Sequence, residues 1–159
     1  MPSRQFVKDL PRAKMASPNT ALDTIKYVFW RLYTPLHPYV RDAALALHVV
    51  RHEKGRQRFL LGRVAPHSTI EEVVLFLVSE HGFGNHFVAW YDDGQVVSLR
   101  RVDGFAYQYH IRIFNDGEIR GHYEYTPEYK PIEHIRETSL EERRDVFLQF
   151  LGDKVVLPE

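Results

Sequence analysis

An α+β fold is predicted by three features of the sequence. Strand-like segments from about His86 to Tyr125 are separated by Asp-Gly and Asn-Asp-Gly signals, which favour an antiparallel meander. Segments with helical periodicity and helix caps lie before and after it. Neither an internal repeat nor a low-complexity linker interrupts the 159 residues, and a hydrophobic content of 44% suffices for one core. We therefore expect a basic mobile arm over residues 1–16, followed by a single α+β domain over residues 17–159.

The first helix is predicted to begin at Ser17 as N-cap, with Pro18 in its first turn, and to end before Pro35. Apolar residues recur there at helical spacing: Ala21, Leu22, Ile25, Val28, Phe29 and Leu32. Residues 44–65 are interpreted as a β-hairpin about a turn at residues 53–56. A helix over residues 39–50 is the alternative, because alanine and leucine favour helices.

Two further helices are predicted from their caps. Ser68-x-x-Glu71 and Thr69-x-x-Glu72 are both capping boxes, and Gly82 ends the helix that follows them. The apolar run over residues 73–78 predicts that this helix is buried. A C-terminal helix is expected from Ser139 to Leu151. We expect the helices to pack mainly on one side of the meander.

The register of the last hairpin follows from the requirement that directly opposed residues share a face. A two-residue loop at Asp116-Gly117 would mix apolar and polar side chains on each face. A three-residue loop, Asn115-Asp116-Gly117, removes this conflict and places Gly117 at the left-handed position that such loops require. One face then pairs Ile113 with Ile119, Ile111 with Gly121, Tyr109 with Tyr123 and Tyr107 with Tyr125. That face is predicted to be core.

The other face of this hairpin is polar. It pairs Arg112 with Arg120, His110 with His122 and Gln108 with Glu124. Like charges directly opposite one another destabilise a sheet, so this face is expected to meet something negative. Tight turns at Asp103-Gly104 and Asp93-Gly94 would extend the register to two more strands. Val97 and Trp90 would then lie in line with the His110–His122 pair, and Leu99 and Val88 in line with the Gln108–Glu124 pair.

Composition narrows the class of protein. The net charge is zero, yet residues 1–63 hold 12 Lys and Arg against 4 Asp and Glu, whereas residues 64–159 hold 9 against 17. Such asymmetry indicates an acidic or nucleic-acid partner for the basic half, or two halves that neutralise each other within one fold. The absence of cysteine excludes thiol chemistry and Cys-based zinc sites. No apolar run is long enough for a membrane span, and we expect a cytoplasmic protein.

The preferred functional hypothesis is a small binding module, not an enzyme, that docks on RNA or a ribonucleoprotein. Arginine binds phosphate through two parallel hydrogen bonds, and phosphate contacts fix position on a nucleic acid without reading its sequence. The residues expected to bind nucleic acid are Arg112, Arg120, His110, His122, Arg51, Lys54, Arg56, Arg58 and Arg63. A protein-interaction domain, including a homo-oligomer, is an alternative. No cofactor is expected.

Two chemical alternatives use the same polar face. His110 and His122 are candidate acid and base of a metal-independent nuclease, with an arginine stabilising charge on phosphorus and His86 as a more distant partner. His110, His122 and Glu124 are instead ligand types that suit zinc or iron, although their spacing matches no specific signature. The remaining histidines discussed, His48, His52, His81 and His134, are interpreted as surface or helix-end residues.

Overall fold

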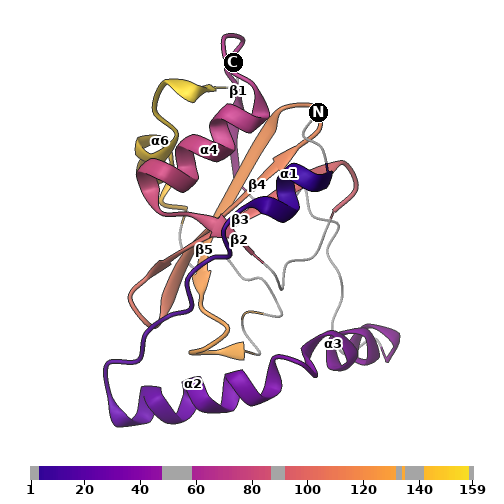
Figure 1. Cartoon of the computed structure of the whole chain (residues 1–159), viewed down its shortest axis with the longest axis vertical. Helices are drawn as coiled ribbons and strands as arrows, with labels where there is room; N and C mark the ends of the chain where they lie inside the picture. The colour runs from indigo at the N-terminus through magenta and orange to yellow at the C-terminus, as the bar shows by residue number, and fades with distance from the viewer. Residues whose placement is uncertain (1–3, 48–58, 87–91, 132–133, 135–141, 158–159) are drawn as a thin grey trace.

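A computed structural model of the chain describes residues 4–47, 59–86, 92–131, 134 and 142–157. It confirms an α+β fold, built on an open antiparallel sheet of six strands in the order β2-β3-β4-β5-β1-β6 (Figure 1). The three turn signals had predicted a meander of four strands, so the strand count and arrangement differ from the prediction. The strands are β1 (Phe59–Val64), β2 (Gly84–Asn85), β3 (Gln95–Asp103), β4 (Tyr107–Phe114), β5 (Glu118–Tyr125) and β6 (Val155–Val156). The helices are α1 (Arg4–Asp9), α2 (Ala21–Tyr33), α3 (His37–Ala46), α4 (Ile70–His81) and α6 (Arg144–Leu151), with a 3-10 turn, η2, over Gly152–Lys154.

One face of the sheet forms the hydrophobic core with α4 and α6. Strand residues alternate between faces, and most apolar residues of β3, β4 and β5 point to this side, whereas Val102, opposite Gln108, and Phe114 fall on the other face. The fully buried members include Leu99, Ile111 and Ile119 from the sheet, Leu77 from α4 and Phe147 from α6. None of the described helices is long and apolar enough to cross a membrane.

The predicted register of the last hairpin is confirmed. Tyr109 lies opposite Tyr123, His110 opposite His122 and Ile113 opposite Ile119. The loop is the three-residue one, and Gly117 takes a φ of 83° that side chains other than glycine rarely adopt. Tyr109, Tyr123 and the isoleucines of this face are core, as expected, but Tyr107 is 37% exposed and Tyr125 is only partly buried, so the prediction was wrong for that pair.

The extension of this register into the preceding strand was wrong. Val97 and Leu99 lie opposite Ile113 and Ile111 in the core instead of joining the polar face. The connection from β3 to β4 spans residues 104–106, one residue more than a tight Asp-Gly turn, and one extra residue moves every side chain to the other face. Trp90 and Val88 lie outside the described residues.

The middle helix, α4, is as predicted. Thr69 accepts a hydrogen bond from the Glu72 backbone N–H, the Glu72 carboxylate accepts one from the Thr69 backbone N–H, and Gly82 ends the helix with a φ of 67°. Two other starts were misplaced. Thr20, not Ser17, caps α2, and α6 begins at Arg144, so residues 142–143, which were expected to be helical, lie outside the observed helix. The expected residues 135–141 of that helix lie outside the described residues.

The predicted hairpin over residues 44–65 was wrong in its first strand. Residues 44–46 belong to α3, in line with the alternative of a helix there, because runs of alanine and leucine favour helix unless a neighbouring strand overrides them. The second strand exists as β1, but it pairs with β5 and β6. The turn expected at residues 53–56 lies outside the described residues.

The described part of the N-terminal arm is packed along β2. Leu10, Ala13 and Ala16 are buried. The backbone N–H of Ala13 donates to the carbonyl of Asn85, whose own N–H donates to the carbonyl of Pro11. Mobility of residues 1–16 stays a prediction, but small and aliphatic side chains anchor more of this segment than its basic composition indicated.

Gly121 supplies a test of the core packing, because a methyl group there would lie 2.8 Å from Leu61 Cδ1 and 3.0 Å from Phe147 Cε1. Overpacking of this kind costs about 1–3 kcal/mol, so Gly121→Ala is expected to lower the free energy of unfolding by that amount in urea titrations. Leu61→Val removes the nearest methyl, and the Gly121→Ala loss should shrink in that background. Equal losses in both backgrounds would contradict this packing.

Candidate metal site

The face of the sheet opposite the core is polar and almost completely buried. We call it the polar layer, and its members expose 8% or less of their surface. They are Ser98 and Arg100 of β3, Gln108, His110 and Arg112 of β4, His122 and Glu124 of β5, and His86, Glu128 and His134 from flanking segments. Buried polar groups need partners, because an unpartnered one costs the desolvation of that group.

Both buried arginines of the polar layer are neutralised by carboxylates. Arg100 Nη2 donates to both oxygens of Glu128, at 3.0 and 2.8 Å, and Glu128 also accepts from the backbone N–H of Ala16. Arg112 Nη1 donates to Asp92 Oδ2 at 2.5 Å. Burial lowers the pKa of Arg112, and the adjacent carboxylate of Asp92 opposes that shift. The negative partners that the polar face was expected to need are therefore side chains of this chain.

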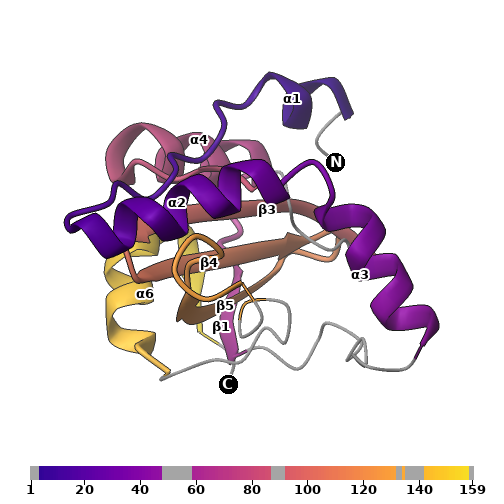
Figure 2. The same ribbon diagram turned by 90° about the horizontal axis from the view of Figure 1, so that it is seen from below.

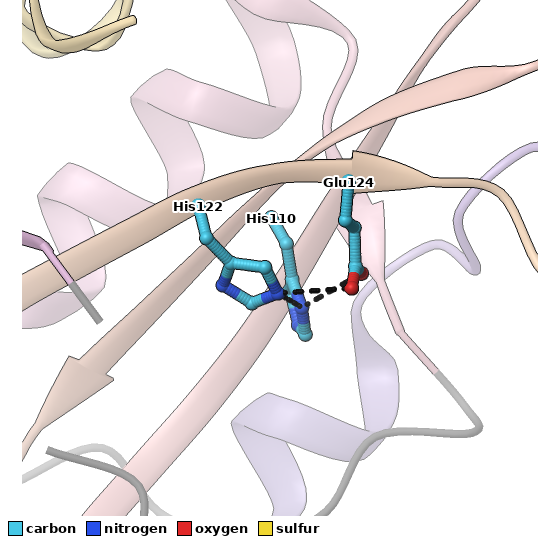
Figure 3. Close-up of side chains that lie close together, drawn as sticks. All are labelled: His110, His122 and Glu124. Carbon is cyan, nitrogen blue, oxygen red and sulfur yellow. Dashed lines mark hydrogen bonds and ion pairs between the residues drawn. The ribbon is translucent and has the colours of Figure 1, made fainter. Parts of the chain in front are cut away.

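His110, His122 and Glu124 converge at the centre of the polar layer, and we call them the His–Glu cluster (Figure 3). His110 lies opposite His122 on the neighbouring strand, and Glu124 is two residues further along β5, on the same face. His110 Nδ1 is 3.3 Å from His122 Nε2 and 3.5 Å from Glu124 Oε1, while His122 Nε2 is 3.2 Å from Glu124 Oε2. Two adjacent strands thus direct three donor atoms to one point.

A second ring of residues surrounds this cluster. His134 Nδ1 lies 3.3 Å from Glu124 Oε1, and Gln108 Nε2 donates to the same oxygen at 2.5 Å. The other ring nitrogen of His110, Nε2, lies 2.5 Å from Ser98 Oγ and 3.3 Å from His86 Nδ1. Glu124 and His110 are therefore each held in place by neighbours in the polar layer.

The protonation states of His110 and Glu124 match those of metal ligands. Burial is the main reason that the pKa of His110 lies well below its usual value, and the pKa of His86 is lowered for the same reason. Burial alone would raise the pKa of Glu124, but His134, His122 and the hydrogen bonds from His110 and His122 outweigh it and hold that pKa well below its usual range. A neutral imidazole and an ionised carboxylate are the forms that coordinate metals.

The predicted nucleic-acid residues are not gathered on one open surface among the described part of the chain. Arg112, His110 and His122 are buried, whereas Arg120 donates to Glu118 at 3.1 Å and has a side chain only 14% exposed. Arg63 also pairs with Glu118, at 3.5 Å. Arg51, Lys54, Arg56 and Arg58 lie outside the described residues.

Several members of the polar layer were missed or misread in the sequence. His134 was interpreted as a surface or helix-end residue, and this was wrong: it is 6% exposed and faces Glu124. Ser98 and Arg100 were missed because the misplaced turn put Val97 and Leu99 on this face. A three-residue loop at residues 104–106, chosen by the same rule as the loop at residues 115–117, would have identified both.

The buried Arg100–Glu128 pair gives a test of this layer. Glu128→Gln leaves the buried guanidinium without a countercharge, and breaking such a pair costs about 3–5 kcal/mol of unfolding free energy. Arg63→Gln is the matched control, because the Arg63 side chain is 55% exposed and surface pairs contribute about 0–1 kcal/mol. Urea titration of both variants measures the difference, and equal losses would argue against a buried, paired Arg100.

Comparison of the chain with protein-family models, with curated protein sequences and with solved structures found no match. The basis for a functional proposal is the geometry of the His–Glu cluster and its neighbours.

Proposed function

We propose that this chain is a zinc-binding protein whose metal ion is held by the His–Glu cluster. The observation that carries the proposal is the convergence of three side chains: His110 Nδ1 and His122 Nε2 are 3.3 Å apart, and they lie 3.5 Å from Oε1 and 3.2 Å from Oε2 of Glu124, respectively. These side chains come from two adjacent strands and are at most 1% exposed.

The spacing fits a metal better than it fits hydrogen bonds alone. Zinc binds imidazole nitrogen and carboxylate oxygen at about 2.0–2.2 Å in a tetrahedral arrangement, which places neighbouring donors about 3.3–3.5 Å apart. Hydrogen bonds between nitrogen and oxygen are shorter, about 2.7–3.2 Å. The two ring nitrogens are 3.3 Å apart, which matches an edge of such a tetrahedron, and each lies at or beyond the long end of the hydrogen-bond range from one oxygen of the Glu124 carboxylate.

Zinc is the ion that the donor set and geometry favour. Imidazole suits zinc, copper, iron and nickel, and a carboxylate is a common partner in zinc and iron sites. His134 is not among the donors that converge within 4.8 Å of one another, but its Nδ1 is 3.3 Å from Glu124 Oε1, so the segment at His134 is linked to the site through that carboxylate. A zinc site with three protein ligands keeps its fourth position for water or another small ligand.

The supporting residues agree with such a role. Metal-bound histidines nearly always engage their second ring nitrogen with an acceptor, and ligating carboxylates are themselves hydrogen-bonded. Ser98 Oγ lies 2.5 Å from Nε2 of His110, the ring nitrogen that does not face the cluster, and Gln108 Nε2 donates to Glu124. In this proposal the ion joins β4 and β5, and it stabilises a sheet face that has no apolar core.

The two hypotheses that use the polar face differently stay predictions. RNA docking would place phosphate against arginines that are now paired with Asp92 and Glu118. A metal-independent histidine nuclease would need a substrate to reach His110 and His122, which are 1% and 0% exposed. Zinc binding is supported more directly, because it uses the buried donors where they lie.

Metal analysis of the purified, untagged protein tests the proposal. After loading with zinc and dialysis, we expect about one zinc ion per chain by mass spectrometry, and a large loss in His122→Ala and Glu124→Gln. His67→Ala is the matched control, since its side chain is 61% exposed and lies apart from the cluster, paired with Asp153 at 3.9 Å. A wild-type chain that retains no metal would overturn the proposal. Stoichiometric iron in place of zinc would overturn the choice of ion but not the ligand set.

Removal of zinc should also destabilise the fold, because an ion that binds only the folded state adds to its stability. At a free zinc concentration a hundredfold above the dissociation constant, the gain is about 2.7 kcal/mol. We therefore expect EDTA to lower the melting temperature of the wild type and zinc to restore it. His122→Ala should respond to neither, and an identical response of both proteins would contradict the assignment.

Ser98→Ala tests the support of the cluster separately from its ligands. Loss of a residue that orients a metal-bound histidine costs about 10–100-fold in metal affinity, so Ser98→Ala should bind zinc that much more weakly in competition with a chromophoric chelator. Ser79→Ala removes an exposed hydroxyl of α4 and should leave the affinity unchanged. Equal affinities of the wild type and Ser98→Ala would show that Ser98 does not position His110.

A further inference from the structure

The outer face of α2 and α3 carries most of the exposed apolar surface. Of 14 large hydrophobic side chains that are exposed among the described residues, nine lie between residues 22 and 47. They are Leu22, Ile25, Val28, Phe29, Leu32, Leu36, Tyr39, Val40 and Leu47, with exposed fractions from 44% to 75%. Single exposed hydrophobic residues are ordinary, but a contiguous group of this size marks an interaction surface.

The opposite side of α2 is what attaches it to the rest of the chain. Trp30 is 1% exposed, and the ammonium group of Lys26 lies 3.9 Å from the centre of the Tyr129 ring. In Figure 1, α2 and α3 lie at the bottom of the molecule, far from α4 and α6, and Figure 2 shows α2 from below in front of the sheet. The helix is thus docked through one side, and its apolar side faces outward.

The spacing of the exposed residues indicates what kind of partner covers them. Within α2, Leu22, Ile25, Phe29 and Leu32 follow one another at alternating intervals of three and four, and Val28 adjoins them. This is the apolar stripe of a helix that packs against other helices in a bundle. Leu36 lies in the turn that separates α2 from α3, and Tyr39 and Val40 continue the exposed apolar surface on α3; we call these residues together the seam.

Charge argues against a membrane as the partner. A helix that lies on an anionic bilayer is rich in Lys and Arg on its polar side. Between them, α2 and α3 hold Lys26, Arg31 and Arg41 against Asp23 and Asp42, which is close to balance. A nearly neutral face with an apolar seam is compatible with an identical copy of itself.

From these observations we propose that the chain forms a symmetric homodimer through the seam of α2 and α3. A standard interface takes about 800 Å² from each partner, and nine large apolar side chains that are each 44% to 75% exposed offer a surface of that order. Symmetric dimers use the same surface on both subunits, so a self-complementary seam is sufficient.

A pocket beside the seam would receive an apolar side chain of the second copy in the dimer. It measures about 210 Å³, lies between α2 and the turn at residues 127–131, and is lined by Ile25, Phe29, Trp30, Pro127, Tyr129 and Pro131. Ile25 and Phe29 belong to both the seam and the pocket. An apolar side chain of the second copy that enters this pocket would be fully desolvated, as the dominant residues of interfaces are.

Light scattering on the full chain after size-exclusion chromatography tests the proposal. At tens of micromolar protein we expect twice the chain mass of 18.7 kDa. The double variant Phe29→Lys, Leu32→Lys should elute as a monomer with an unchanged circular dichroism spectrum. Leu75→Lys on α4, at a residue that is 51% exposed and outside the seam, is the matched control and should remain dimeric.

A milder variant covers the case in which two lysines disturb the fold. Leu32→Ser removes apolar surface without adding charge and should raise the dimer dissociation constant at least tenfold. His122→Ala, which is expected to lack metal, should stay dimeric, so failure of the zinc proposal and failure of this one are distinguishable. A monomeric wild type, a dimer that survives Phe29→Lys, Leu32→Lys, or a monomer that co-sediments with phosphatidylserine vesicles would overturn the dimer.

Discussion

The pairing of β4 with β5 is the constraint on which the rest of the structure depends. Because the loop between them has three residues and ends on Gly117 with a positive φ, every side chain of both strands is assigned to one face. The isoleucines and tyrosines meet α4 and α6 on one side, and the histidines, arginines and Glu124 gather on the other. Slippage by a single residue would bury charges in the apolar core and would also separate His110, His122 and Glu124.

The polar layer shows how a small domain can bury charge on one side of its sheet. Each buried arginine has a carboxylate partner, and the central imidazoles surround the carboxylate of Glu124. Buried ion pairs add little net stability compared with apolar residues of equal volume, so their presence here is better explained by a role than by packing. Metal binding is the role that the convergence of the donors supports. A bound ion would stabilise the polar layer, as hydrophobic contacts stabilise the other face of the sheet.

Much of the fold was predictable because local rules decided it. The capping box at Thr69, the glycine that ends α4 and the register of the last hairpin each follow from a few adjacent residues. Predictions failed where tertiary contacts decided: residues 44–46 are helical although a strand was expected, and the extra residue in the 104–106 connection reversed the faces of β3. For the site, His110, His122 and Glu124 were identifiable as possible ligands, but the burial of that face and the approach of His134 depend on segments distant in the sequence.

The two outermost strands, β2 and β6, are only two residues long, and the backbone of residues 11–13 is already bonded to Asn85 of β2. Open sheets are prone to join further strands along unpaired edges, which leads to uncontrolled aggregation. Among the described residues, the two edge strands offer few backbone groups that could template another strand. Strand addition at these two strands is therefore disfavoured, and the contact between copies that we propose uses the exposed helices instead.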